Sequence, residues 1–64
     1  MLTMTERQGF DAMVLFLKEW YRQTKYDQIG LLLGELKILP DGSTGDPGAW
    51  GDWMDAVNKA LSQP

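Results

Sequence analysis

The chain has 64 residues, of which 44% are hydrophobic and 23% charged, and this length suits one small domain with a single core. It contains no cysteine and no histidine, which excludes disulfides, thiolate metal sites, cysteine nucleophiles and the commonest acid–base group. We therefore expect one domain over residues 1–64 that is not an enzyme, uses no cofactor and binds no metal.

Nine acidic and six basic residues give a net charge of -3, the opposite sign from a surface that binds phosphate backbones. Acids and bases balance as far as Lys37, whereas the part from Ile38 onward has four aspartates and only Lys59 as a base. This negative C-terminal part could steer a basic protein partner, or it could simply keep the protein in solution. Nucleic acid is not expected as a partner.

The first residues lack the basic segment of a signal peptide, and no apolar run is long enough for a membrane span. We expect a cytoplasmic protein that does not contact a membrane.

A first helix is predicted over residues 4–24. Thr3 and Glu6 have the spacing of a capping box, which places the start of this helix near Met4. Apolar side chains then recur every three or four residues and form one stripe. That stripe consists of Phe10, Met13, Val14, Leu17 and Tyr21, and Phe16 and Trp20 widen it. Leu15 falls on the opposite side of the helix and should be exposed.

A second helix is predicted over residues 28–37, with Asp27 as its N-cap. Its core face consists of Ile29, Leu32, Leu33 and Leu36. The opposite face carries Gly30, Leu31 and Gly34 where polar residues are usual, although each interior glycine costs a helix about 1 kcal/mol. This face is either a docking surface for a protein or is covered by the chain's own 38–45 loop, and we favour the cover.

A third helix is predicted over residues 47–61, after a turn at Asp41-Gly42. Asp46 is the expected N-cap, and Pro47 is suited to the first helical position. The apolar stripe consists of Trp50, Trp53, Met54, Val57, Ala60 and Leu61. Three such helices predict an all-α fold, a small three-helix bundle. Its core should contain Phe10, Val14, Leu17, Leu33, Leu36, Trp53 and Val57.

Asp52 and Asp55 lie three residues apart, a spacing that could pair two carboxylates or bind a hard cation such as magnesium. Acids near the start of a helix also complement its dipole, and we favour this interpretation because no third ligand or phosphate loop accompanies them. The stretch Asp41 to Asp46 does not match a calcium-binding EF-hand loop, since its sixth and twelfth positions are Asp46 and Asp52.

Three segments resemble a group of small bacterial proteins, some of which look like immunity proteins of polymorphic toxins. They are Ile29 to Leu36, Leu39 to Gly42 and Asp46 to Val57, and they lie within a stretch of about half of the chain. The resemblance implies a bacterial cytoplasmic protein and makes toxin neutralisation a candidate function. It assigns no catalytic or ligand residue.

Two functions are favoured, and a third class, an enzyme that uses Asp52 and Asp55 with magnesium, would require a metal-dependent rise in melting temperature. The first is an acidic protein-interaction domain, such as an immunity-type inhibitor of a basic partner. The alternative is a structural or regulatory module that associates with a second copy of itself. The residues expected to bind the protein partner, or the second copy, are Gly30, Leu31, Gly34, Asp52 and Asp55.

Overall fold

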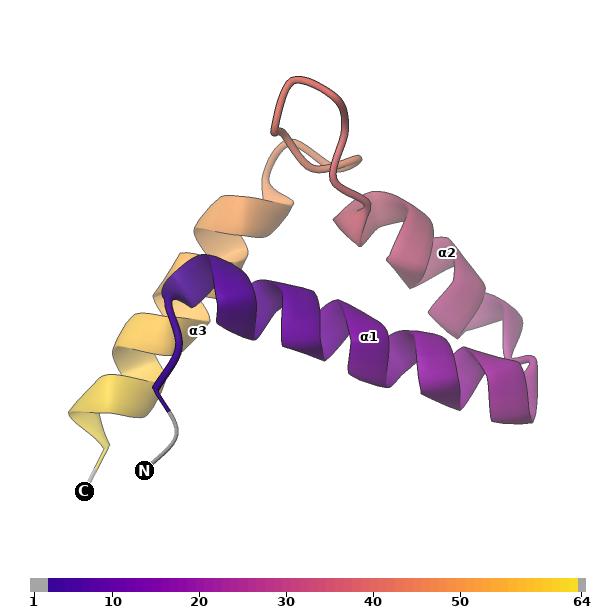
Figure 1. Ribbon diagram of the computed structural model, residues 1–64, viewed down its shortest axis with the longest axis horizontal. Coiled ribbons are helices and arrows are strands. Elements are labelled where there is room, and N and C mark those ends of the chain that lie inside the picture. Colours follow the sequence, from indigo (N-terminus) through magenta and orange to yellow (C-terminus); the bar gives the residue numbers. More distant parts are fainter. Residues whose placement is uncertain (1–2, 64) are drawn as a thin grey trace.

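The computed structural model describes residues 3–63 and contains three helices. They are α1 (Glu6–Thr24), α2 (Asp27–Leu36) and α3 (Ala49–Ser62) (Figure 1). No strand occurs within residues 3–63, and a single isolated bridge pairs Ile38 with Thr44. The predicted all-α three-helix fold is therefore confirmed.

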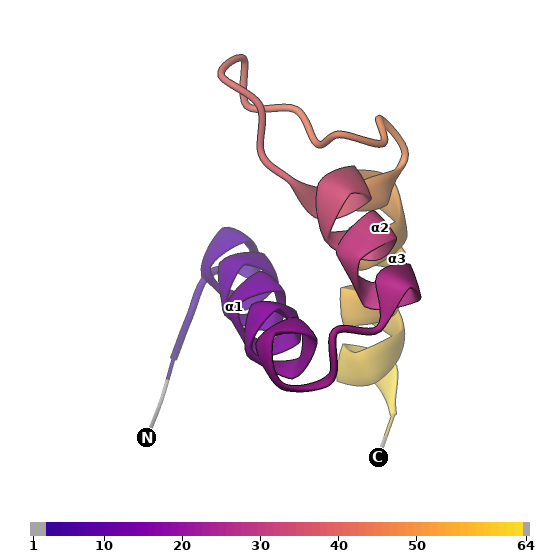
Figure 2. The same cartoon turned by 90° about the vertical axis from the view of Figure 1, so that its right-hand side faces the viewer.

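The helices are arranged as an open bundle. α2 turns back along α1 after a short connection, and α3 passes behind the N-terminal half of α1 (Figure 1). In the perpendicular view, α2 and α3 lie on the same side of α1 (Figure 2). The radius of gyration is 12.8 Å, compared with about 10.7 Å for a compact chain of this length. Because α2 and α3 diverge from their loop, α1 cannot be covered along its whole length.

Helix α1 begins two residues later than predicted. The capping box forms between Thr5 and Gln8, with the Gln8 amide donating to Thr5 Oγ1 and the Thr5 amide donating to Gln8 Oε1, both at 3.0 Å. Thr5-x-x-Gln8 fits the same capping-box motif as Thr3-x-x-Glu6. The sequence therefore allows two overlapping capping boxes, and the structure contains the later one. The end at Thr24 agrees with the prediction.

The starts of the other two helices also differ from the prediction. Asp27 lies in the first turn of α2, and its N-cap is Tyr26. The expected cap at Asp46 and Pro47 is wrong, because α3 begins at Ala49 with Gly48 as its N-cap. Asp46 instead closes a turn before the helix: Oδ1 accepts from the Gly48 amide at 2.8 Å, and the main-chain oxygen accepts from the Ala49 amide at 3.0 Å.

The segment between α2 and α3 is a compact turn fastened to the end of α2. The Leu39 amide donates to the Ser43 carbonyl at 2.7 Å, and Gly42 has a φ of 88°, which favours glycine. The Asp46 amide donates to the Glu35 carbonyl at 2.8 Å. A side chain at Gly45 would collide with the Gly34 carbonyl oxygen, so glycine is required for this close approach.

The core is smaller than the helical stripes predict. Phe10 and Leu36 are the buried hydrophobic residues of the described chain. The Phe10 ring packs against Trp50 and Trp53, with ring centroids at 5.5 and 5.8 Å. The other predicted core residues, Val14, Leu17, Leu33, Trp53 and Val57, are only half-buried. The reason is the open arrangement of α2 and α3, which covers the helical stripes incompletely.

Candidate functional site

Exposed apolar side chains are the main feature of the surface. Eight large hydrophobic residues within the described chain are exposed: Met4, Leu15, Phe16, Trp20, Tyr26, Leu31, Leu32 and Leu61. The exposure of Leu15 confirms the prediction, and Leu61, at the end of the apolar stripe of α3, is 80% exposed. The total accessible surface is 5212 Å², about a quarter more than a compact monomer of this mass exposes.

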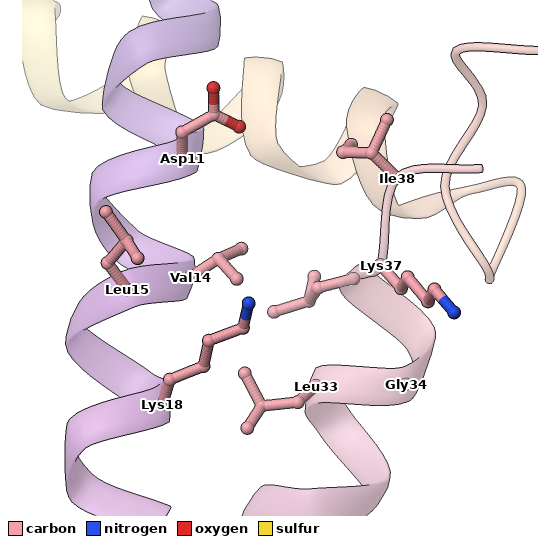
Figure 3. Close-up of a pocket in the computed structure, with 9 residues that line it drawn as sticks. Asp11, Val14, Leu15, Lys18, Leu33, Gly34, Lys37 and Ile38 are labelled. Atoms are coloured by element: carbon pink, nitrogen blue, oxygen red, sulfur yellow. The ribbon is translucent and has the colours of Figure 1, made fainter. Parts of the chain in front are cut away.

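One groove lies between α1 and α2 and is called the α1/α2 groove (Figure 3). Its volume is about 600 Å³, and its lining is mainly apolar. Val14, Lys18 and Leu33 extend into the space between the two helices, whereas Lys37 points away from α1 (Figure 3). The remaining lining residues are Asp11, Leu15, Gly34, Leu36 and Ile38. Two lysines and one aspartate therefore give this groove a mixed charge.

A second groove lies where all three helices meet and is called the acidic groove. Its volume is about 280 Å³. Its apolar lining consists of Phe10, Met13, Leu32, Leu36, Ala49 and Trp53. Glu35, Asp46 and Asp52 also line it, while lysine and arginine are absent from the described residues that do so. Apolar contact area and negative charge thus occur together at this groove.

Asp52 and Asp55, predicted together, have different surroundings. Both residues are exposed, but Asp52 lines the acidic groove and Asp55 does not. Within residues 3–63, no group of three or more potential ligands is placed to hold a metal ion. The structure therefore combines Asp52 with Glu35 and Asp46 rather than with Asp55.

The structure separates the three residues Gly30, Leu31 and Gly34. A Cβ at Gly30 would lie 3.0 Å from the ring of Tyr21, so this glycine allows α1 to approach α2 closely. A Cβ at Gly34 would meet nothing within 4 Å. Leu31 is 72% exposed, so the expected cover by the 38–45 loop is wrong: the loop reaches only the carbonyl end of α2. Leu31 and Gly34 remain available on the surface.

Local hydrogen bonds lower the pKa of two exposed carboxyl groups. The Asp41 carboxylate accepts from the Ser43 hydroxyl at 2.6 Å and from the Ser43 amide at 3.0 Å, which lowers the pKa of Asp41. The Arg22 guanidinium and then the Gln23 amide lower the pKa of Glu19. Neither carboxyl lines a groove, and we assign these bonds to turn and helix formation.

Sequence reasoning missed Glu35 and Asp46 as members of a site. Glu35 looked like an ordinary helical acid, and Asp46 was assigned to capping alone. The signal for Glu35 was its place beside Leu32 and Leu36 on the helix, at the edge of the apolar face. For Asp46 the sequence contained no such signal, because its position depends on the turn that joins it to the Glu35 carbonyl.

Comparisons with known proteins found no relative of this chain. No family model, no curated protein and no solved structure matches it. Within the part of the chain that the structure describes, no helix combines the length and the apolar character that crossing a membrane requires. The function must therefore be argued from the surface itself.

Proposed function

We propose that this chain is a protein-interaction domain whose exposed apolar surface is covered by a protein partner. The observation that carries the proposal is the small core: residues 3–63 contain two buried hydrophobic residues and eight exposed large ones. The surface in excess of a compact monomer is about 1,100 Å². A standard protein–protein interface buries about 800 Å² on each partner, so the excess is large enough for one such interface.

A basic partner is the form of this proposal that the charges favour. Three carboxylates line the acidic groove, no lysine or arginine among the described residues lines it, and the net charge of the chain is -3. Opposite charges on two proteins speed their association, and like charges disfavour the binding of an acidic competitor. The resemblance to immunity proteins leads to the same proposal, an inhibitor that covers a basic toxin in the bacterial cytoplasm.

Co-expression tests the immunity form of the proposal. The product of the adjacent gene, expressed alone in a bacterial host, should arrest growth, and co-expression of this chain should restore growth. The two proteins should also copurify as a complex of fixed stoichiometry. Growth arrest that this chain does not relieve, or the absence of a complex, would contradict the immunity assignment.

Self-association is the second candidate, and the position of Leu31 favours it. Leu31 is exposed beside a recess that Tyr21, Asp27, Gly30 and Leu33 complete, and Leu33 also lines the α1/α2 groove. The mixed charges of that groove would not repel a second copy. Sedimentation velocity of the purified chain distinguishes the candidates. A concentration-dependent dimer that Leu31→Glu abolishes without loss of helicity supports self-association, and a monomer at all concentrations contradicts it.

A further inference from the structure

We propose that the acidic groove receives a basic amphipathic helix of the partner. The apolar side of that helix would lie on Met13 and Leu32, and its lysines or arginines would lie beside Glu35 and Asp52. This inference rests on the proposed function and adds to it the surface and the chemistry of the segment that binds there.

The shape of the apolar surface favours an elongated occupant. Gly9 lies against the Trp53 side chain, and Met13 lines the acidic groove. Phe16 and Trp20 continue the same row of α1 at helical spacing, beyond the part that α3 covers. Their ring centroids lie 6.4 Å apart with the ring planes tilted by 59°, and the two residues are 62% and 48% exposed. From Gly9 to Trp20 this row is about 16 Å long, a length that matches three turns of a helix.

Leu32 of α2 provides the other side of this surface. It lines the acidic groove together with Met13 and is itself 40% exposed. A helix seated between Leu32 and the Phe16–Trp20 pair would lie against the α1–α2 pair on the flank that α3 leaves open. Its side chains at positions i, i+3, i+4 and i+7 would supply the matching apolar stripe.

The charges select a basic helix over an acidic one or a second copy. The two ion pairs within residues 3–63 join Arg7 to Asp11 and Arg22 to Glu19, so neither neutralises Glu35 or Asp52. An acidic helix would add like charges to three carboxylates. A second copy seated symmetrically on the same groove would bring two such sets together, which costs free energy. A partner helix that carries lysine or arginine would avoid the like-charge repulsion expected for an acidic helix and for a second copy.

A designed peptide tests the proposal with the full chain. The probe is a synthetic amphipathic helix of leucine and lysine with leucine at i, i+3, i+4 and i+7, and the control peptide carries glutamate in place of lysine. In nuclear magnetic resonance titrations of the labelled protein, the lysine peptide should shift the amides of Met13, Leu32 and Asp52. It should leave those of Leu15 and Ile38, at the α1/α2 groove, unchanged. The glutamate peptide should shift neither set.

Matched variants separate charge from apolar contact. Glu35→Gln with Asp52→Asn should weaken binding of the lysine peptide by about tenfold or more. Asp11→Asn with Asp55→Asn removes the same charge outside the groove and should leave binding nearly unchanged. Phe16→Ala should weaken binding by a similar factor, whereas Leu61→Ala, at another exposed apolar position, should not. Far-ultraviolet circular dichroism establishes that each variant keeps its helical content.

Three outcomes would overturn the inference: shifts concentrated at the α1/α2 groove, equal affinity of the two charge-matched double variants, or equal binding of the glutamate peptide. The proposed function is tested separately by the complex with the adjacent gene's product. If that complex forms, resists Glu35→Gln with Asp52→Asn and is lost in Leu31→Glu, the function stands and the acidic groove is not its site.

Discussion

Phe10 is the residue that packs α1 against α3. It is fully buried and contacts both Trp50 and Trp53, whereas each tryptophan is half-buried. The sequence predicted both Phe10 and Trp53 as core residues, because each lies at the centre of an apolar stripe. Because the bundle is open, Trp53 stays half-buried, and burial of Phe10 contributes more to the stability of the fold.

Replacing Phe10 should therefore destabilise the protein more than replacing any exposed aromatic residue. Phe10→Ala should cost about 3–5 kcal/mol, which approaches the whole stability that a core of this size supplies. Phe16→Ala removes the same atoms from an exposed position and should cost less than about 1 kcal/mol. Chemical denaturation monitored by circular dichroism measures both. Equal costs would show that Phe10 is not the centre of the core.

The Asp41–Ser43 contact gives the 38–45 turn a dependence on pH. The folded pKa of Asp41 is lowered by the Ser43 hydroxyl and amide, so the contact stabilises the turn above the unfolded pKa of the carboxyl. That contribution is lost as the pH falls through the lowered folded pKa. Ser43→Ala should move the pKa of Asp41 back toward its ordinary value, as carboxyl chemical shifts would record. An unchanged titration midpoint would contradict the hydroxyl's role.

At the scale of the elements, helical periodicity and turn residues were enough to predict three helices with ends within two residues of those observed. All three N-cap assignments were wrong, two of them for a common reason. Thr3 and Thr5 begin equivalent motifs, and Asp46 can either cap a helix or close a turn. Local sequence does not decide between such options. In the structure Asp46 closes the turn, and its amide also donates a hydrogen bond to the carbonyl of Glu35, which belongs to α2. Such a contact between different elements cannot be predicted from local sequence.

The two glycines of α2 have different roles despite their shared spacing, and alanine substitution should distinguish them. Gly34→Ala places its Cβ in open space and should stabilise the protein by about 0.5–1 kcal/mol, because alanine favours the helix. Gly30→Ala requires the Tyr21 ring to shift and should yield no gain or a loss. Thermal and chemical unfolding of the two variants provide the comparison. A larger gain at Gly30 would refute the assignment of its contact with Tyr21.

At the scale of the whole molecule, the open shape could not be predicted from the helical stripes. Each stripe indicates which side of a helix is apolar, but the angle between α2 and α3 depends on the turn at residues 38–45 and its attachment to Glu35 and Lys37. For this reason the exposure of Phe16 and Leu32 appeared only in the structure. The same angle creates the acidic groove from residues of three separate helices and a turn.

The uneven charge of the whole molecule should control how fast a basic partner arrives. Added salt should slow association with the lysine peptide, because it screens the field of the C-terminal part. Reversing Asp52 and Asp55 to lysine should slow association severalfold and flatten the salt dependence. Stopped-flow tryptophan fluorescence measures these rates. A rate that does not respond to salt would indicate that apolar contact alone drives the encounter.

The hydrogen bond from the Trp53 indole to the Glu6 carbonyl, 3.1 Å long, joins residues 47 positions apart in the sequence. Contacts so distant along the chain require a large loop to close, whereas α1 and α2 are joined by a short connection. Docking of α3 should therefore follow the transition state of folding. Trp53→Phe removes the indole donor and should speed unfolding while leaving the folding rate unchanged, whereas Leu33→Ala should slow folding. The reverse pattern in the folding kinetics would place α3 in the nucleus.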